Sequence, residues 1–298
     1  MKNVKNTIED IKLKYLGKLD SLDLDLLISF VLKKEREFIL AHPEYLLTSK
    51  QQSTIDKVMA RRLKNEPLSY ILGEKEFYGL NFKVNQHTLI PRPETELMVE
   101  LALEEILKAQ YPILNTIDIG TGSGNIIISL AHQLKNTSYQ LPVTNYLAID
   151  ISKEAIKIAK QNAKFHNLNK QIKFLHGNLL EPIVKSKIIN HKSSLLILAN
   201  LPYLSKDIYN ACAENVKKYE PRTALYSATY GLAHYEELLG QIKLLIDTHQ
   251  QAIVLLIEIS PEQKKLLPPL IKKYFPQAQL TFIKDLTQRW RFCKIILK

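Results

Sequence analysis

The residues that follow one aliphatic segment of the chain could hold a planar amino or amide group. Leu195–Leu198 predicts a buried strand, and the chain continues as Ala199-Asn200-Leu201-Pro202-Tyr203. The side-chain oxygen of Asn200 and the carbonyl of Leu201 could accept hydrogen bonds from the two N–H groups and so orient the nitrogen lone pair. Pro202 restricts Leu201 to an extended backbone, and Tyr203 could stack on the planar group. The alternative is an ordinary turn, in which Asn and Pro are common.

A glycine-rich turn lies upstream, between a predicted strand over 116–119 and a predicted helix over 125–134. Its sequence is Asp118-Ile119-Gly120-Thr121-Gly122-Ser123-Gly124. Glycines let the backbone turn sharply and approach a ligand closely. The third glycine comes one residue too early for a dinucleotide fingerprint, and the chain has no P-loop pattern. We expect Gly120, Thr121, Gly122, Ser123 and Gly124 to bind a nucleotide-like cofactor, whereas Asp118 either contacts the cofactor or holds the loop through backbone hydrogen bonds.

Two further strand ends carry polar residues that suit a nucleoside. Asp150 ends the strand predicted over 145–149, about 30 residues after the first glycine, and could accept hydrogen bonds from both ribose hydroxyls. NAD and S-adenosylmethionine share that ribose. Asp150 could instead be the N-cap of the helix that follows. Asn178 and Leu179 follow the strand predicted over 172–175, a position that commonly brackets an adenine ring.

Composition bounds the class of protein. The chain has 298 residues, of which 46% are hydrophobic, and a formal net charge of +11, which fits one large domain and a small one. The lysines are scattered, so the charge indicates either a phosphate-rich partner or a solvated surface without a specific role. Cys212 and Cys293 are far apart and the histidines lack metal-ligand spacing, so we expect a reducing cytoplasm and no metal. The sequence has no long uncharged apolar segment, so we predict no membrane span.

Hydrophobic periodicity predicts three regions. Residues 1–75 have apolar side chains at helical spacing, 76–93 form a hairpin linker, and in 94–298 strands and helices alternate. Alternation predicts an α/β domain with a mostly parallel sheet and helices on both faces. The remaining strands are expected over 195–199, 252–259, 280–283 and 291–297, the last two as an antiparallel pair. The remaining helices of this region are expected over 94–108, 153–166, 233–247 and 262–274.

The chain also resembles a known family. Asn200–Tyr203 is similar to the N-P-P-Y motif of class I methyltransferases that modify amide or amino nitrogens. Three further segments, from about residue 60 to the end, resemble the PrmC/HemK family of release factor glutamine N5-methyltransferases. They are Glu66-Pro67-Leu68-Ser69-Tyr70-Ile71-Leu72-Gly73 with Phe77-Tyr78-Gly79-Leu80, Leu89-Ile90-Pro91-Arg92-Pro93-Glu94-Thr95-Glu96, and Tyr219-Glu220-Pro221-Arg222-Thr223-Ala224-Leu225.

The resemblance implies a fold and an activity. It implies a class I, Rossmann-like methyltransferase domain with a seven-stranded sheet, preceded by a helical substrate-recognition domain over 1–75. It also implies S-adenosylmethionine as methyl donor and, as partner, a peptide chain release factor whose Gly-Gly-Gln loop is methylated on the glutamine N5. Membrane, metal and nucleic acid are not expected partners.

The resemblance also implies roles for individual residues of this chain that match the positions of the family motifs. Asn200 would contact both cofactor and substrate, and Asn200–Tyr203 would hold the glutamine side chain. Arg92 and Glu94 would shape the substrate entrance, although the two could simply pair as surface charges. The chain departs from the family at Leu201, which replaces a proline, and at Asn178-Leu179, which replaces Asp-Trp. The first change keeps the backbone carbonyl, whereas the second removes an indole from the adenine site.

Two other functions stay open at this stage. An N6-adenine methyltransferase acting on DNA or RNA would meet the same –NH₂ group, and the basic charge suits phosphate. A cofactor-binding protein without catalysis, bound to the ribosome or a translation factor, is the second. Intact Asn200, Pro202 and Tyr203 argue against the second function, and the short sequence between Tyr203 and Gly231 argues against the first.

Overall fold

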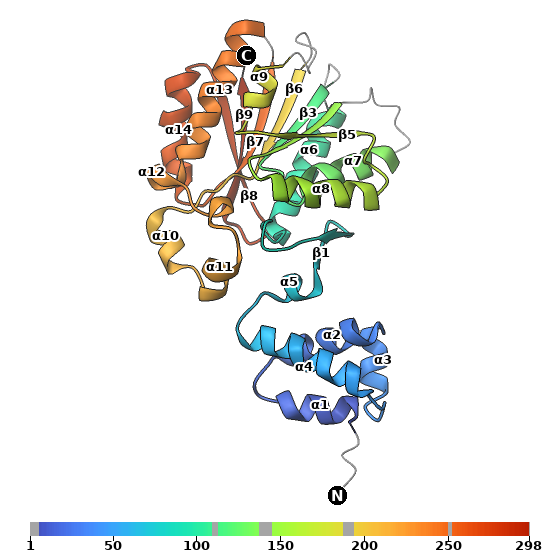
Figure 1. Cartoon of the computed structure of the whole chain (residues 1–298). Coiled ribbons are helices and arrows are strands. Elements are labelled where there is room, and N and C mark those ends of the chain that lie inside the picture. The colour runs from blue at the N-terminus through green and yellow to red at the C-terminus, as the bar shows by residue number, and fades with distance from the viewer. Residues whose placement is uncertain (1–5, 109–112, 137–144, 187–193, 250–251, 298) are drawn as a thin grey trace, which may run out of the picture. The chain divides into compact units, whose positions relative to one another are not determined.

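The computed structural model describes residues 6–108, 113–136, 145–186, 194–249 and 252–297 (Figure 1). Its internal contacts divide the chain into two units. One is Met1–Glu74 with Ala213–Tyr219, and the other is Lys75–Cys212 with Glu220–Lys298. The grouping of Ala213–Tyr219 with the N-terminal residues was not expected from the sequence, which predicts one continuous helical region over 1–75.

The first unit, which we call the helical unit, is built from helices, three of which begin with a side-chain cap. The side chain of Thr7 begins the first helix in a capping box with Asp10, and Thr48 begins the fourth in a capping box with Gln51. Apolar side chains of the helices between Ile8 and Leu72 share one buried core. The hydroxyl of Tyr219 donates to the carbonyl of Lys64 at 2.9 Å. The helices are α1 (Ile8–Tyr15), α2 (Ser21–Leu32), α3 (Arg36–Ala41), α4 (Ser49–Leu63), α5 (Leu68–Leu72) and α11 (Glu214–Tyr219).

The expected hairpin is confirmed as strands β1 (Glu74–Phe77) and β2 (Leu80–Lys83). Tyr78 and Gly79 connect them with φ of +54° and +70°, which is the left-handed pair that a tight two-residue hairpin turn requires. Asn162 then ties β2 to the larger unit. Its side chain accepts from the N–H of Lys83 at 2.8 Å and donates to the carbonyls of Lys83 at 3.0 Å and Ser123 at 2.8 Å.

The expected mostly parallel sheet of seven strands is also confirmed. Among the described residues its order is β5-β4-β3-β6-β7-β9-β8. Neighbours from β5 to β7 pair in parallel, and β9 pairs antiparallel with both β7 and β8. The strands are β3 (Ile113–Ile119), β4 (Asn145–Asp150), β5 (Ile172–His176), β6 (Ser194–Ala199), β7 (Ile253–Glu258), β8 (Gln279–Lys284) and β9 (Trp290–Leu297).

Helices cover both faces of this sheet (Figure 1). Successive side chains of a strand point to opposite faces, so Leu195 and Ile197 of β6 join a core with α13 and α14, whereas Leu196 and Leu198 join a core with α6 and α7. The helix expected over 94–108 begins as a 3₁₀ turn at Pro93. The helical elements are η1 (Pro93–Thr95), α6 (Glu96–Lys108), α7 (Asn125–Asn136), α8 (Lys153–Phe165), α9 (Glu181–Val184), α10 (Lys206–Ala211), η2 (Arg222–Ala224), α12 (Ala228–Gly231), α13 (Ala233–His249) and α14 (Gln263–Tyr274).

Candidate active site

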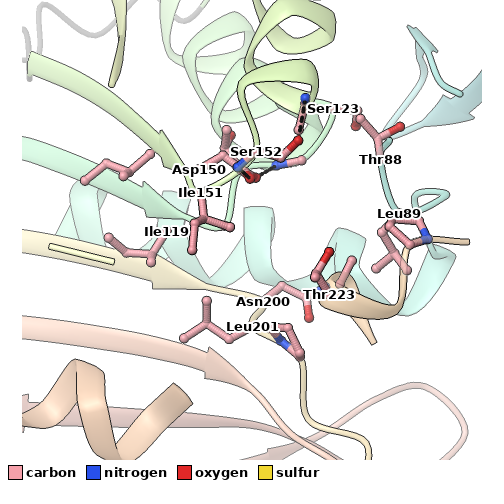
Figure 2. Close-up of a pocket in the computed structure, with 18 of the residues that line it drawn as sticks. Thr88, Leu89, Ile119, Ser123, Asp150, Ile151, Ser152, Asn200, Leu201 and Thr223 are labelled. Atoms are coloured by element: carbon pink, nitrogen blue, oxygen red, sulfur yellow. Dashed lines mark hydrogen bonds between the residues drawn. The ribbon is translucent and has the colours of Figure 1, made fainter. Parts of the chain in front are cut away.

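The register of the central strands brings the predicted features together. Ile119 of β3 pairs with Ile149 of β4 and with Ala199 of β6. Gly120, Asp150 and Asn200 follow these three residues, so they leave neighbouring strands at the same level. Together they line one cavity of about 240 Å³ (Figure 2). Open α/β sheets bind ligands at this edge, beyond the carboxyl ends of the parallel strands.

Most of the residues predicted for the site line this cavity. They are Arg92, Gly120, Thr121, Gly122, Ser123, Asp150, Asn178, Leu179, Asn200, Leu201 and Pro202. Glu94, Asp118, Gly124 and Tyr203 are not part of the lining among the described residues. The loop Gly120–Gly124, called the glycine loop below, and the loop Asn200–Tyr203, called the acceptor loop, therefore face the same space.

Backbone conformation shapes the glycine loop. The φ angle is +70° at Gly120, +56° at Gly122 and +82° at Gly124, in the region that favours glycine. The N–H groups of Gly120 and Thr121 both donate to the carbonyl of Ile149, at 2.9 and 3.0 Å. A Cβ at Gly120 would lie 3.2 Å from the side chain of Leu201. The buried Leu201 side chain thus packs directly against the glycine loop.

Asp118 lies beneath the glycine loop and is fully buried. Its Oδ2 accepts a hydrogen bond from the Thr121 hydroxyl at 2.6 Å, while Oδ1 has no partner among the described residues. Burial raises the pKa of this carboxyl to about 7. Of the two roles predicted for Asp118, the geometry favours support of the loop, through the hydroxyl of Thr121, over direct contact with a cofactor.

Asp150 connects the glycine loop to the start of α8. Its Oδ2 accepts from the N–H of Gly122 and its Oδ1 from the N–H of Ser152, both at 2.8 Å. The alternative that Asp150 caps the following helix is wrong, because Ser152 is the N-cap and accepts from the N–H of Ala155 at 3.1 Å. Burial raises the pKa of Asp150, and the two N–H donors oppose that shift. A carboxylate keeps further lone pairs for ligand hydroxyls.

Asn178 and Leu179 stand at the end of β5, on the wall that the sequence assigned to adenine. Leu179 is buried and has a φ of +50°, which is uncommon for a branched residue. The amide Nδ2 of Asn178 donates to Glu237 of α13 at 2.5 Å, so its Oδ1 is the end available to a ligand. His234, at the start of α13, also lines the cavity, and its Nδ1 is 2.8 Å from the Ser227 hydroxyl.

Residues from two other elements, Thr95 of η1 and Glu258 of β7, hold the side chains of the acceptor loop. The Nδ2 of Asn200 donates to the Thr95 hydroxyl oxygen at 3.3 Å. That hydroxyl in turn donates to Oε2 of Glu258 at 2.7 Å, and the Tyr203 hydroxyl donates to Oε1 of Glu258 at 3.3 Å. Glu258 ends β7 and is 2% exposed. Burial raises its pKa to about 7.

The backbone of the acceptor loop has its own support. Gly231 has a φ of +81°, and a Cβ at this position would lie 2.0 Å from the carbonyl oxygen of Tyr203. The buried side chain of Gln263 donates to the carbonyls of Gly231 at 2.8 Å and Tyr203 at 3.4 Å. Its Oε1 accepts from the N–H of Ser260 at 3.0 Å. The Tyr203 carbonyl therefore needs a residue without a side chain beside it.

Arg92 pairs with a residue that the sequence did not suggest. Its Nη2 lies 2.5 Å from Oε1 of Glu220, a carboxylate that is 1% exposed. Oε2 of Glu220 accepts from the N–H of Ile90 at 3.1 Å. Glu94 is exposed on η1. The alternative in which Arg92 and Glu94 pair as surface charges is therefore wrong, since the partner of Arg92 is the buried Glu220.

Comparison with known proteins identifies both parts of the chain. The family model described as the PrmC N-terminal domain matches residues 17–73, and the model described as a methyltransferase domain matches residues 112–263. The release factor glutamine methyltransferase of Enterococcus faecalis is 35% identical, over 83% of this chain and 82% of that protein. The chain belongs to the release factor glutamine methyltransferase family. Its relative from Clostridium botulinum is 34% identical over 92% of this chain and 90% of that protein, and its relative from Coxiella burnetii is 37% identical over 82% of both.

Solved structures support the fold. The hMettl16 catalytic domain, solved in complex with the MAT2A 3′UTR hairpin 1, aligns with a TM-score of 0.53 at 16% identity and covers 81% of this chain and 80% of that one. At that identity the likeness extends to the fold alone. None of the described helices is long and apolar enough to cross a membrane.

Membership of this family makes S-adenosylmethionine the methyl donor, and the cavity fits that group. The glycine loop exposes backbone without Cβ atoms, and at Gly122 a Cβ would meet no atom closer than 3.9 Å. The carboxyl group of Asp150 lines the same cavity, as do the polar Asn178 and the apolar Leu179. Glycine loop and carboxylate together form the donor set that an adenosyl group with a ribose requires.

Sequence reasoning missed the residues that support the acceptor loop and Arg92. Thr95, Glu220, Gly231, Glu258 and Gln263 all contact predicted site residues. Thr95 and Glu220 lie inside segments that carry the family resemblance, so the resemblance could have singled them out, whereas no pattern marked Glu258.

Proposed function

We propose that this protein transfers a methyl group from S-adenosylmethionine to the side-chain amide nitrogen, N5, of the glutamine in the Gly-Gly-Gln loop of peptide chain release factors. The observation that carries this proposal is the side chain of Asn200. Its Nδ2 donates to Thr95, and Asn200 lines the same cavity as Asp150 and the glycine loop. A carboxamide acceptor beside a nucleoside site suits an –NH₂ nucleophile.

The acceptor loop would position the glutamine amide. An amide nitrogen is a weak nucleophile because its lone pair is delocalised into the carbonyl. Oδ1 of Asn200 and the carbonyl of Leu201 would accept its two N–H groups and direct the lone pair at the reacting carbon. Tyr203 would stack on the amide plane, and catalysis would come mainly from orientation. The methylated nitrogen is acidic enough to lose its proton to water, so no residue is assigned as general base.

The glycine loop and its neighbours would hold the donor. When bound, S-adenosylmethionine supplies a methyl group made electrophilic by its sulfonium. Gly120–Gly124 would lie against its methionine part. Asp150 would accept from its ribose hydroxyls, and Asn178 with Leu179 would contact its adenine. Asp118 would act from below, through Thr121. Asn200 would touch both donor and substrate.

The remaining expectations concern the partner. Arg92 and Glu94 would shape the substrate entrance, with Arg92 fixed by Glu220. We propose residues 1–75 as the substrate-recognition part, residues 76–93 as the linker and residues 94–298 as the catalytic part. A cytoplasmic location, where release factors act, suits the two free cysteines. Nucleic acid and metal are not proposed as partners.

Incubation with labelled S-adenosylmethionine tests the proposal. A release factor and a DNA duplex are offered in parallel, and mass spectrometry locates the product. We expect one added methyl group on the glutamine of the Gly-Gly-Gln loop and none on DNA. Asn200→Ala should lower kcat by about 10²-fold or more, by analogy with loss of one group of an oxyanion hole, while affinity for the cofactor drops less. Asn210→Ala, on exposed α10, is the matched control. Label on adenine alone would replace this proposal with the N6-adenine activity.

A further inference from the structure

A buried chain of hydrogen bonds connects the two polar side chains of the acceptor loop. Asn200 donates to Thr95, Thr95 donates to Glu258, and Tyr203 donates to the other oxygen of Glu258, at 3.3, 2.7 and 3.3 Å. Thr95 and Glu258 are 1% and 2% exposed, so water does not compete for these bonds. Neither residue is needed to hold the glycine loop or Asp150.

The direction of each bond follows from its neighbour. A hydroxyl has one proton to donate. The Thr95 proton goes to the carboxylate of Glu258, which can only accept, so the Thr95 oxygen can only accept from Asn200. The NH₂ end of the Asn200 carboxamide must then face Thr95, and its carbonyl end faces the cavity. The opposite orientation would offer a donor to a substrate –NH₂ group, which is the wrong polarity.

We propose that Thr95 and Glu258 are positioning residues that determine which end of the Asn200 carboxamide faces the substrate. This inference rests on the proposed function, because it assigns Asn200 the role of acceptor for an –NH₂ group. Tyr203 shares the same carboxylate, so Glu258 fixes both ends of the acceptor loop at once. Thr95 lines the cavity beside Asn200, whereas Glu258 is not part of the lining among the described residues. Both are assigned a role that acts through Asn200 and Tyr203.

The polarity of the chain depends on the proton of Glu258. Once protonated, this carboxyl can donate to Thr95, whose own proton is then free to turn toward Asn200 and favour the reversed carboxamide. The groups that face Glu258 are Thr95 and Glu94 from η1, Tyr203 from the acceptor loop and Arg291 from β9, while Tyr235 of α13 donates to its backbone carbonyl. Burial dominates and raises its pKa to about 7, so the productive orientation is lost as the pH falls below neutrality.

Matched variants test the proposal against a merely structural role. Thr95→Val removes the hydroxyl at constant shape, Thr95→Ser restores it, and Glu258→Gln removes the charge. We expect Thr95→Val and Glu258→Gln to lower kcat by about 10-fold to 10²-fold, with cofactor Kd changed less than about twofold and Thr95→Ser close to wild type. The kcat of the wild type, measured from about pH 5.5 to about pH 8.5, should fall on the acid side, and Glu258→Gln should lose that fall. An unchanged acid limb in Glu258→Gln, or a loss confined to cofactor affinity, would overturn the proposal.

A readout without turnover separates this inference from the proposed function. The side-chain NH₂ signals of Asn200, assigned by their absence in Asn200→Ala, should titrate near neutrality in the wild type and stay constant in Glu258→Gln. If the wild type fails to methylate a release factor yet these signals titrate, the substrate assignment is wrong and the role of Thr95 and Glu258 in orienting Asn200 is supported. If the signals are unaffected by both pH and Thr95→Val in a folded protein, that role is wrong whatever the substrate.

Discussion

The glycine loop and the acceptor loop line the same cavity but are built in different ways. The glycine loop takes its shape from its own residues and from the next strand, through three positive φ angles and hydrogen bonds to Ile149 and Asp150. The acceptor loop has an ordinary backbone and depends on residues far along the chain. Thr95 is 105 positions from Asn200, and Glu258 is 55 positions from Tyr203. One loop therefore carries its geometry locally, whereas the other obtains it from tertiary packing.

The largest effect on the acceptor loop is expected at Gly231. Gly231→Ala would place a Cβ 2.0 Å from the Tyr203 carbonyl oxygen, so the acceptor loop must shift. We expect kcat/KM to fall by about 10²-fold, as for a displacement of about 1 Å in an active site, with cofactor Kd changed little. The control is Gly79→Ala, because Gly79 has a similar φ of +70° and no atom within 4 Å of its Cβ position. Equal losses in both variants would trace the effect to backbone strain rather than to the acceptor loop.

The ion pair of Arg92 and Glu220 tests how much a contact between residues distant in sequence contributes to stability. Arg92→Met would leave a carboxylate that is 1% exposed without its partner. Breaking a buried pair this way costs about 3 kcal/mol or more; since Arg92 is itself partly exposed, we expect about 2 kcal/mol, measured by urea unfolding. The double variant Arg92→Met/Glu220→Gln should recover much of that loss. A double variant as unstable as the single one would show that the charge is not the cause.

Asp150→Ala tests the glycine loop without changing the acceptor loop. It removes the acceptor for the N–H groups of Gly122 and Ser152 and the acceptor proposed for the ribose hydroxyls. We expect KM for the cofactor to rise by about 10-fold or more and kcat to change less, because the acceptor loop does not touch Asp150. Steady-state kinetics with each substrate varied in turn would separate the two terms. Asp207→Ala, an exposed carboxylate on α10, should change neither.

The smallest expected effect concerns the support beneath the glycine loop. Burial raises the pKa of Asp118 from an ordinary 3.8 to about 7. Its folded state therefore binds the proton more tightly, and the stability it contributes is present below its unfolded pKa and is lost as the pH rises toward about 7. Asp118→Asn does not titrate, so its Tm should rise relative to the wild type between about pH 4 and about pH 7 and stay level above that. A constant difference across this range would contradict the raised pKa.

The same contrast explains what the sequence could predict. Periodicity and turn chemistry are local, so the alternating strands and helices, the Tyr78-Gly79 hairpin and the strand ends at Gly120, Asp150 and Asn200 could all be placed before the structure was seen. Even there, the role of Asp118 could not be decided, because it depends on the Thr121 hydroxyl turning down to meet it. Arg92 was assigned Glu94 as an alternative partner because Glu94 is near in sequence, whereas Glu220 is 128 positions away. A single sequence contains no signal for such a pairing.

Helix α11 has a consequence for how this protein can be divided. Because Ala213–Tyr219 groups with Met1–Glu74, the order of segments along the gene and the modular make-up of the folded chain do not coincide. A fragment that stops at residue 75 would lack the helix whose Tyr219 hydroxyl donates to Lys64, and the complementary fragment would carry that helix without this acceptor. Truncation at residue 75 would therefore disrupt the helical unit itself. A design that keeps α11 together with the first 74 residues preserves that unit.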